Sequence, residues 1–200
     1  CRRDERYCFT RITPERVSGE LGEMLDRARE HGPVLIVDRD GTIMADKDYL
    51  GDPSGVELLP GAATALREAR AAGYKIVVVS NQSGVARGYF SIEAVERVNA
   101  RLGELLEREG VQIDGMYYCP HYRKGSVTEY ATECDCRKPA PGMVERAARE
   151  IGFDPRRVWV MGDKMDDMNL ARVMGARGVL VRTGHGKDEE LRLGAQGQSG

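Results

Sequence analysis

The sequence lacks a long apolar run and a strong net charge of either sign. No stretch approaches the roughly 18 apolar residues that a membrane-spanning helix needs, and the N-terminal segment lacks the apolar centre of a secretory signal. The chain has 30 Lys and Arg residues against 32 Asp and Glu residues, for a formal charge of -2. No global basic field is therefore available to hold nucleic acid. These absences predict a soluble, cytoplasmic protein that binds neither membranes nor nucleic acid.

Cysteine is scarce, and the five cysteines are an odd number. Three of them, Cys119, Cys134 and Cys136, lie close together in the sequence and near His121. In a cytosolic chain such a cluster more often binds a metal than forms disulfides. Four ligands of this kind fill a tetrahedral zinc shell and leave no open position for catalysis. We predict a structural Zn²⁺ site in the loop 119–136, with buried thiols near a core imidazole as the alternative.

Short apolar runs alternate with helical patterns along the chain, which is 41% hydrophobic and long enough for one compact domain. This alternation indicates an α/β fold with a doubly wound parallel sheet. The predicted helices begin near Pro60, Ser91, Pro141 and Met168. The predicted strands are 34–37, 75–79, 115–118, 158–161 and 179–181.

The predicted domain that carries the chemistry spans residues 34–184. Residues 1–33 are polar and rich in arginine, and they are interpreted as an N-terminal extension with one short amphipathic helix. Residues 185–200 are polar and rich in glycine, which predicts a loose C-terminal tail.

Polar residues follow the apolar runs, and the carboxyl ends of parallel strands meet at one edge of a sheet. Asp38 and Asp40 follow the first run, Ser80 the second and Asp163 the fourth, while Lys138 precedes a predicted helix. Three carboxylates and two groups able to hold phosphate oxygens suit phosphoryl transfer, and oxygen ligands suit Mg²⁺. An isolated Asp-x-Asp pair is more often a turn, and Asp163 could simply begin a helix. The order of the residues along the chain favours the catalytic reading.

These residues resemble the four motifs of the haloacid dehalogenase (HAD) superfamily: Asp-x-Asp-Gly-Thr from Asp38, then Ser80, Lys138 and Asp163. The resemblance implies a Rossmann-like sheet with a minimal cap. It implies that Asp38 is the nucleophile and forms an aspartyl phosphate, that Asp40 acts as general acid and then base, and that Ser80 and Lys138 stabilise the phosphate. It also implies that Asp38, Asp163 and the backbone carbonyl of Asp40 hold Mg²⁺.

Longer runs at 80–88, 119–121 and 134–139 resemble the D-glycero-D-manno-heptose 1,7-bisphosphate 7-phosphatases. This resemblance implies a phosphomonoester hydrolase that removes the C7 phosphate of a small phosphorylated sugar, in a pathway that supplies heptose for bacterial surface polysaccharide. We expect a monomer. Arg137 is the candidate for the second, anomeric phosphate, because a guanidinium can grip two phosphate oxygens. The implied substrate contacts are Asp46, Lys47, Asp48, Tyr49, Ser80, Asn81, Gln82, Ser83, Arg137, Lys138 and Lys164.

Two alternatives remain open. Histidinol-phosphate phosphatases and polynucleotide 3'-phosphatases have similar motifs, and the former have a similar zinc loop, but they tend to follow Asn-Gln with Asp-Gly where this chain has Ser83-Gly84. The second alternative is a catalytically silent, zinc-stabilised module that binds a sugar phosphate. Such proteins normally lose an essential acid, whereas Asp38, Asp40 and Asp163 are all present.

Overall fold

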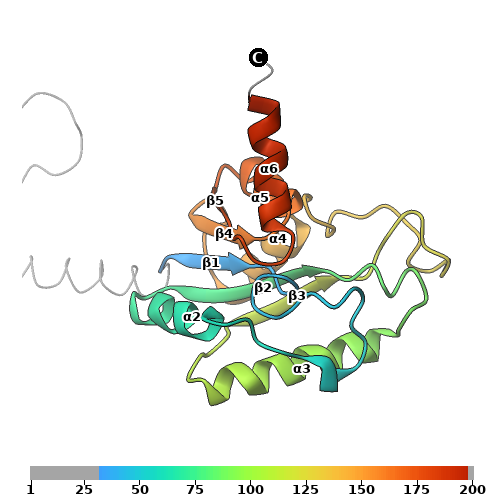
Figure 1. The fold of residues 1–200 in the computed structure, drawn as a ribbon, viewed down its shortest axis with the longest axis horizontal. Coiled ribbons are helices and arrows are strands. Elements are labelled where there is room, and N and C mark those ends of the chain that lie inside the picture. The colour runs from blue at the N-terminus through green and yellow to red at the C-terminus, as the bar shows by residue number, and fades with distance from the viewer. Residues whose placement is uncertain (1–31, 198–200) are drawn as a thin grey trace, which may run out of the picture.

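The backbone alternates strands with helices over residues 32–197, the part of the chain that the computed structural model describes (Figure 1). The predicted helix of the N-terminal extension lies outside these residues. Five parallel strands form one sheet in the order β3-β2-β1-β4-β5, which confirms the predicted α/β fold. The chain builds outward from β1 in both directions, so the strand order reverses between β1 and β4. The strands are β1 (Val34–Val37), β2 (Lys75–Asn81), β3 (Gly115–Cys119), β4 (Val158–Gly162) and β5 (Arg177–Leu180).

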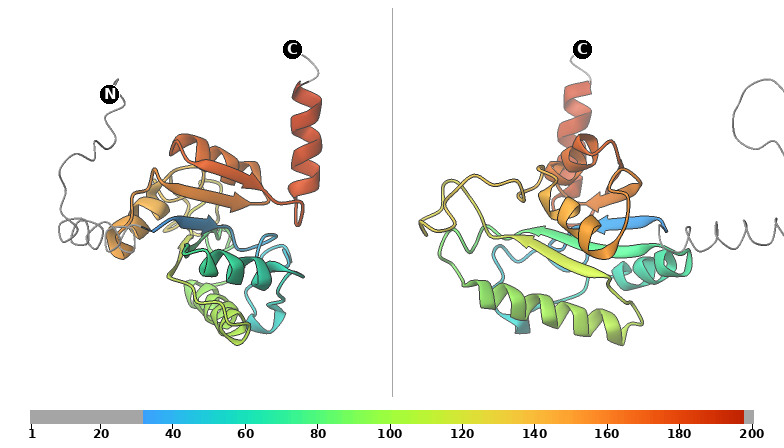
Figure 2. Two further views of the ribbon diagram at one scale, coloured as in Figure 1. Left: turned by 90° about the vertical axis from the view of Figure 1, so that its left-hand side faces the viewer. Right: turned by 180° about the vertical axis from the view of Figure 1, so that it is seen from behind.

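The sheet is covered by helices on both faces, α2 and α3 on one and α4 and α5 on the other (Figures 1 and 2). The helix α3 begins after Ser91, whose side chain accepts a hydrogen bond from the amide of Ala94, as the sequence predicts. A short 3-10 helix, η1, lies between β1 and α2. The bounds are η1 (Pro53–Gly55), α2 (Ala62–Ala71), α3 (Ile92–Arg108), α4 (Gly142–Ile151), α5 (Met165–Val173) and α6 (Gly186–Gly197).

All four residues of β1 are buried, because the strand lies at the centre of the sheet between two layers of helices. Leu35 and Val37 pack toward α2 and α3, whereas Val34 and Ile36 pack toward α4 and α5. A strand buried on both faces needs apolar side chains at every position, not at alternate ones. This explains the unbroken apolar run that precedes Asp38.

The C-terminal segment differs from its prediction. The loose tail expected over 185–200 is wrong for most of its length, since α6 occupies Gly186–Gly197 and extends away from the sheet (Figure 2). Asp188 and Glu189 lie in its first turn, where the helix dipole favours negative charge. The glycines of the segment masked this helical signal. The boundaries proposed for the central domain stay predictions.

Two long connections extend beyond the carboxyl ends of the strands (Figure 1). Residues 82–91 follow β2, and residues 120–141 follow β3; neither contains a helix or strand. Within residues 32–197 no further domain is inserted into the sheet, in agreement with a minimal cap. No helix in this part of the chain combines the length and the apolar character needed to cross a lipid bilayer.

Candidate active site

A cleft of about 360 Å³ lies beyond the carboxyl ends of the central strands. Most of the predicted site residues line it, although they come from segments far apart in the sequence. Lys47 is not among the lining residues; its ammonium group forms an ion pair with Glu57 at 3.1 Å. Asp163 is fully buried and does not line the cleft. The predicted residues that line the cleft are Asp38, Asp40, Asp46, Asp48, Tyr49, Ser80, Asn81, Gln82, Ser83, Arg137, Lys138 and Lys164.

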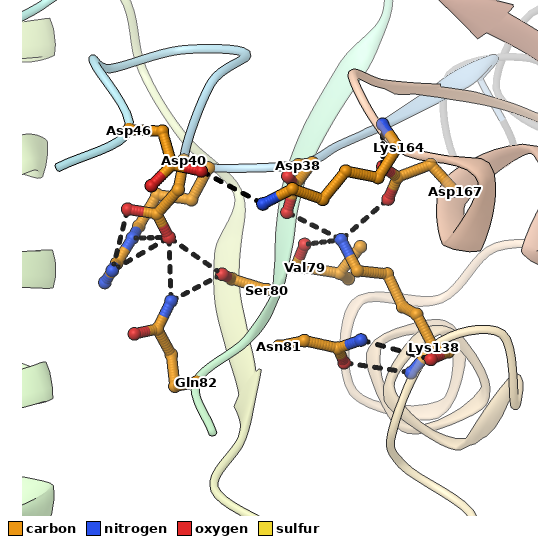
Figure 3. A network of polar contacts seen from close by, with 11 residues as sticks. Asp38, Asp40, Asp46, Val79, Ser80, Asn81, Gln82, Lys138, Lys164 and Asp167 are labelled. Atoms are coloured by element: carbon orange, nitrogen blue, oxygen red, sulfur yellow. Dashed lines mark hydrogen bonds and ion pairs between the residues drawn. The ribbon is translucent and has the colours of Figure 1, made fainter. Parts of the chain in front are cut away.

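Lys138 joins the first strand to the helix α5 at the base of this cleft (Figure 3). Its Nζ donates to Oδ1 of Asp38 at 2.6 Å, to Oδ1 of Asp167 at 2.7 Å and to the carbonyl oxygen of Val79 at 2.9 Å. All three ammonium protons are therefore used. The side chain of Asn81 holds the backbone of Lys138 at two points, accepting from its amide at 2.9 Å and donating to its carbonyl at 3.1 Å.

The charges around Lys138 are unbalanced. Burial raises the pKa of Asp38 to about 7, against the attraction of the Lys138 ammonium. Burial by itself would lower the pKa of Lys138, but the carboxylates of Asp38 and Asp167 outweigh it and raise that pKa above its usual value. Lys138 thus remains charged at neutral pH. One ammonium facing several buried carboxyl groups leaves an excess of negative charge that a divalent cation would offset.

Asp38, Asp163 and Asp167 offer carboxylate oxygens that all lie within 4.8 Å of one another. Oδ2 of Asp163 accepts a hydrogen bond from the backbone amide of His185 at 2.8 Å, whereas its buried Oδ1 has no partner within residues 32–197. An unpartnered buried carboxylate oxygen is costly unless a cation binds it. Gly41 has a positive φ of 79°, and a Cβ atom there would collide with the Asp163 carboxylate. These residues fit Mg²⁺, which prefers oxygen ligands.

Asp40 lies in a different environment from Asp38. Its carboxylate accepts two hydrogen bonds from the guanidinium of Arg39, both at 3.1 Å, and one from Nε2 of Gln82 at 2.8 Å. Ser80 adds a weaker contact at 3.3 Å. Arg39 is 1% exposed, and its remaining Nη1 donates to Oδ1 of Asn99 on α3 at 2.7 Å. The role of Arg39 was not predicted, although its position between the two aspartates was the available signal.

The predicted zinc ligands converge on one point. The Sγ atoms of Cys119, Cys134 and Cys136 lie 3.0–3.5 Å from one another, and Nδ1 of His121 lies 3.3 Å from the Sγ of Cys136. Disulfide sulfurs would be about 2.05 Å apart. Ligands at the corners of a zinc tetrahedron are separated by roughly 3.7 Å, as Zn–S bonds of about 2.3 Å require. The four residues therefore fit a closed Zn²⁺ shell.

Comparison with known proteins identifies the family to which this chain belongs. A family model described as HAD-hydrolase-like matches residues 135–198. The chain is 42% identical, over 154 residues, to the D-glycero-beta-D-manno-heptose-1,7-bisphosphate 7-phosphatase of Escherichia coli K12. The aligned region covers 76% of this chain and 80% of that protein. Identity to the phosphatase of the same name from Pasteurella multocida is 40% over 151 residues, or 75% of this chain and 82% of that one. The chain belongs to this family of HAD-like phosphatases.

A solved structure supports the same assignment. The D,D-heptose 1,7-bisphosphate phosphatase of B. bronchiseptica, complexed with magnesium and phosphate, is 31% identical to this HAD-like phosphatase and superposes with a TM-score of 0.70. The match covers 80% of this chain and 86% of that chain. This chain and that phosphatase therefore have the same fold over most of residues 32–197.

Several residues of this HAD-like phosphatase line the cleft without having been predicted to do so, among them Arg87, Tyr122 and His185. Arg87 belongs to the run 80–88 that resembles the family, so a signal was present. Tyr122 and His185 lie in loops, where no periodicity marks a side chain as part of a site. Met44 is fully buried in the core and does not line the cleft.

Proposed function

We propose that this chain is a Mg²⁺-dependent phosphatase that removes the C7 phosphate of D-glycero-D-manno-heptose 1,7-bisphosphate and leaves heptose 1-phosphate. The names of its relatives support the substrate. The observation that carries the proposal is the contact of Lys138 with Asp38 at the base of the cleft, close to a buried carboxylate oxygen of Asp163 that has no partner within residues 32–197. Such an arrangement provides a nucleophile, a fixed positive charge and a cation ligand for phosphoryl transfer.

In the first step, a carboxylate oxygen of Asp38 attacks the phosphorus of the C7 phosphate. The bond between phosphorus and the O7 oxygen of the sugar breaks, and Asp40 donates a proton to that oxygen. The product on the protein is an aspartyl phosphate. Lys138 holds Asp38 in place and offsets its charge, and Ser80 and Gln82 orient Asp40.

In the second step, Asp40 takes a proton from a water molecule as that water attacks the aspartyl phosphate. The bond between Asp38 and phosphorus breaks and inorganic phosphate is released, which restores the starting protein. Bound Mg²⁺, held by Asp38, Asp163 and the backbone carbonyl of Asp40, would supply charge neutralisation for the phosphoryl oxygens. Because one residue both gives and takes the proton, Asp40 needs a defined orientation in both steps.

The proposed Zn²⁺ site serves this reaction through structure. The ion would be held at both ends of a long loop by Cys119, His121, Cys134 and Cys136. Arg137 and Lys138 come directly after the last of these ligands in the sequence. Closing such a loop lowers the entropy lost when Lys138 is fixed beneath Asp38. The proposed substrate contacts that complete the cleft are Arg137, Lys164, Asp46, Asp48 and Tyr49.

Steady-state kinetics with Mg²⁺ test the proposal. The panel comprises both anomers of heptose 1,7-bisphosphate, histidinol phosphate and a 3'-phosphorylated oligonucleotide. We expect kcat/KM for the heptose bisphosphate to exceed that for the other substrates by at least about tenfold, a difference of roughly 1.4 kcal/mol. Higher kcat/KM for histidinol phosphate would reject the heptose assignment.

Asp38→Asn tests the mechanism. The amide cannot attack phosphorus, so turnover should be abolished while circular dichroism and thermal unfolding remain similar to those of the wild type. Retained turnover in this variant would contradict a covalent intermediate on Asp38. A wild-type protein that binds the bisphosphate but turns over none of the panel, with or without Mg²⁺, would instead favour the catalytically silent binding module.

A further inference from the structure

One residue of the cleft, His185, contacts a proposed metal ligand and a proposed substrate contact at the same time. Its backbone amide donates to Oδ2 of Asp163 at 2.8 Å, and its ring Nε2 lies 3.3 Å from Oδ2 of Asp46. The carboxylates of Asp163 and Asp46 and a ring nitrogen of His185 all lie within 4.8 Å of one another. His185 therefore connects the part of the cleft that would bind the cation to the part that would bind the sugar.

The backbone of His185 is held from two sides. The residue lies in the turn between β5 and α6, and its carbonyl oxygen accepts from the amides of Asp188 and Glu189 at 3.0 and 3.1 Å. On the other side, Gly184 packs so closely against Asp163 that a Cβ atom at residue 184 would collide with the carboxylate. These contacts fix the backbone from which the His185 ring extends.

Two basic side chains contact the same oxygen of Asp46. Nζ of Lys164 donates to Oδ2 at 3.0 Å (Figure 3), and the ring of His185 faces this same atom. Oδ1 accepts from the backbone amide of Asp48 at 3.1 Å. A carboxylate oxygen can accept two hydrogen bonds, so among residues 32–197 Oδ2 has its two partners and Oδ1 keeps one position. That position suits a hydroxyl donor such as those of a sugar.

The segment that carries Asp46 needs support from its surroundings. Asp48 and Tyr49 have positive φ angles of 44° and 69°, a region that residues with a side chain occupy uncommonly. Such a conformation persists where surrounding contacts hold the segment. The contacts of Lys164 and His185 with Asp46 provide support two residues before Asp48.

We propose that His185 is a positioning residue, which holds the carboxylate of Asp46 in the orientation that accepts a sugar hydroxyl and links that carboxylate to Asp163. The inference rests on the proposed function, because a sugar phosphate is the ligand that Asp46 would contact. Lys164 supplies the shorter contact with Asp46, and His185 adds a second from a different element. Two contacts from separate elements restrict rotation of a carboxylate more than one does. His185 takes no part in making or breaking bonds.

His185→Ala tests this role, because it removes the ring and keeps the backbone amide that contacts Asp163. We expect KM for heptose 1,7-bisphosphate to rise by about three- to tenfold, as for the loss of one hydrogen bond, with kcat changed by less than about twofold. The Mg²⁺ concentration for half-maximal activity should change by less than about twofold, because the amide is retained. His185→Gln keeps a nitrogen donor near the position of Nε2 and should recover most of the loss.

A substrate without sugar hydroxyls separates positioning from a general structural effect. p-Nitrophenyl phosphate has no hydroxyl group to donate to Asp46, so His185→Ala should change its kcat/KM by less than about twofold. In an Asp46→Ala background, His185→Ala should have no further effect on the bisphosphate, because residues that act through one contact are not additive.

Lys187→Ala is the matched control. Lys187 is an exposed basic residue two positions further along the chain, and it does not line the cleft. We expect it to change neither substrate's kcat/KM by more than about twofold. Equal losses on the two substrates in His185→Ala, or an unchanged KM for the bisphosphate, would overturn the positioning role.

A binding measurement separates this inference from the proposed function. If the wild type fails to hydrolyse heptose 1,7-bisphosphate, the proposed function fails, and calorimetric titration of Asp38→Asn with this compound decides the inference. An affinity about three- to tenfold lower after addition of His185→Ala would retain the positioning role. An unchanged affinity, or no binding to Asp38→Asn, would overturn it.

Discussion

At the scale of single residues, the two aspartates of the Asp-x-Asp pair are held by two different buried cations. Lys138 contacts Asp38, and Arg39 contacts Asp40. The ammonium of Lys138 also contacts a second carboxylate, Asp167, whereas Arg39 donates two hydrogen bonds to the carboxylate of Asp40. Carboxylates placed two residues apart can take different roles when their environments differ in this way.

Arg39→Lys should impair proton transfer more than substrate binding. Lysine keeps the charge but cannot form the paired contact with Asp40 or also reach Asn99, so Asp40 loses its fixed orientation. We expect kcat to fall by about 10- to 100-fold with KM changed by less than about threefold, measured by steady-state kinetics. Asn99→Ala, which frees only the far end of Arg39, should have a smaller effect of the same kind. A rise in KM at constant kcat would contradict this role.

Gly41→Ala should weaken Mg²⁺ binding. A Cβ atom at residue 41 would collide with the carboxylate of Asp163, and the positive φ of 79° adds strain for any other residue. Displacement of Asp163 should raise the Mg²⁺ concentration for half-maximal activity by at least about tenfold. Substituting a residue that orients a metal ligand typically lowers metal affinity by a factor of this size. Gly61→Ala is the control, because Gly61 also has a positive φ but has nothing near its Cβ position. An unchanged Mg²⁺ requirement in Gly41→Ala would show that Asp163 can move without cost.

At the scale of elements, the connection between β3 and α4 combines three functions. It begins at the end of β3 with Cys119, it carries Tyr122, and it ends with Arg137 and Lys138 before α4. A loop of this length without helix or strand needs an internal constraint to place charged side chains precisely. The cysteine and histidine cluster is that constraint if it holds Zn²⁺, which links metal binding to the position of Lys138.

Cys136→Ser should destabilise this connection and lower activity together. Serine is a poor zinc ligand, so the loop loses its closure near Lys138. We expect Tm to fall by about 5 °C or more, which corresponds to roughly 2 kcal/mol for a chain of this size, and metal analysis to find less than one zinc per chain. Cysteine-to-serine substitution at Cys1, which lies outside the sequence segment 119–136, is the matched control. Full zinc content with unchanged Tm in Cys136→Ser would refute a structural zinc at this cluster.

At the scale of the whole molecule, stability, pH and Mg²⁺ are linked through the buried carboxyl groups. Burial is the first cause that raises the pKa of Asp38, to about 7, and it also raises the pKa of Asp163. The unfolded chain ionises Asp38 near its ordinary value of 3.8. Between these values the folded state binds the extra proton, so the contribution of Asp38 to the unfolding free energy falls as pH rises toward 7.

Added Mg²⁺ should reverse that trend, because it binds the ionised carboxylates. With a pKa of about 7 for Asp38, the affinity for Mg²⁺ should be about tenfold higher at pH 8 than at pH 6. The increase in Tm on adding Mg²⁺ should be larger at pH 8 for the same reason. Thermal unfolding and calorimetry at the two pH values measure both effects, with Asp163→Asn as the variant that should lose the response. A Mg²⁺ affinity that does not change between pH 6 and pH 8 would exclude Asp38 as the titrating ligand.

The strands and the order of the catalytic motifs could be predicted because they depend on local chemistry. The run Val34–Val37 is apolar throughout because both faces of β1 are covered, and Ser91 begins α3 through its own side chain. The helix α6 was missed because its glycines have a low helix propensity, which obscured the helix-forming residues between them. The contact of Arg39 with Asn99 could not be predicted, because the two residues are 60 positions apart in the sequence.

By itself, the sequence determined the alternation of strands and helices and the residue types available for phosphoryl transfer and metal binding. These follow from the period of apolar residues and from which side chains can attack, donate protons or hold cations. Only the tertiary structure decided which charges neutralise one another. It paired Lys138 with Asp38 and Asp167, and it placed Arg87 and Arg137 against the ring of Tyr122. The physical reason is that electrostatic energy depends on distance and burial, which sequence separation does not determine.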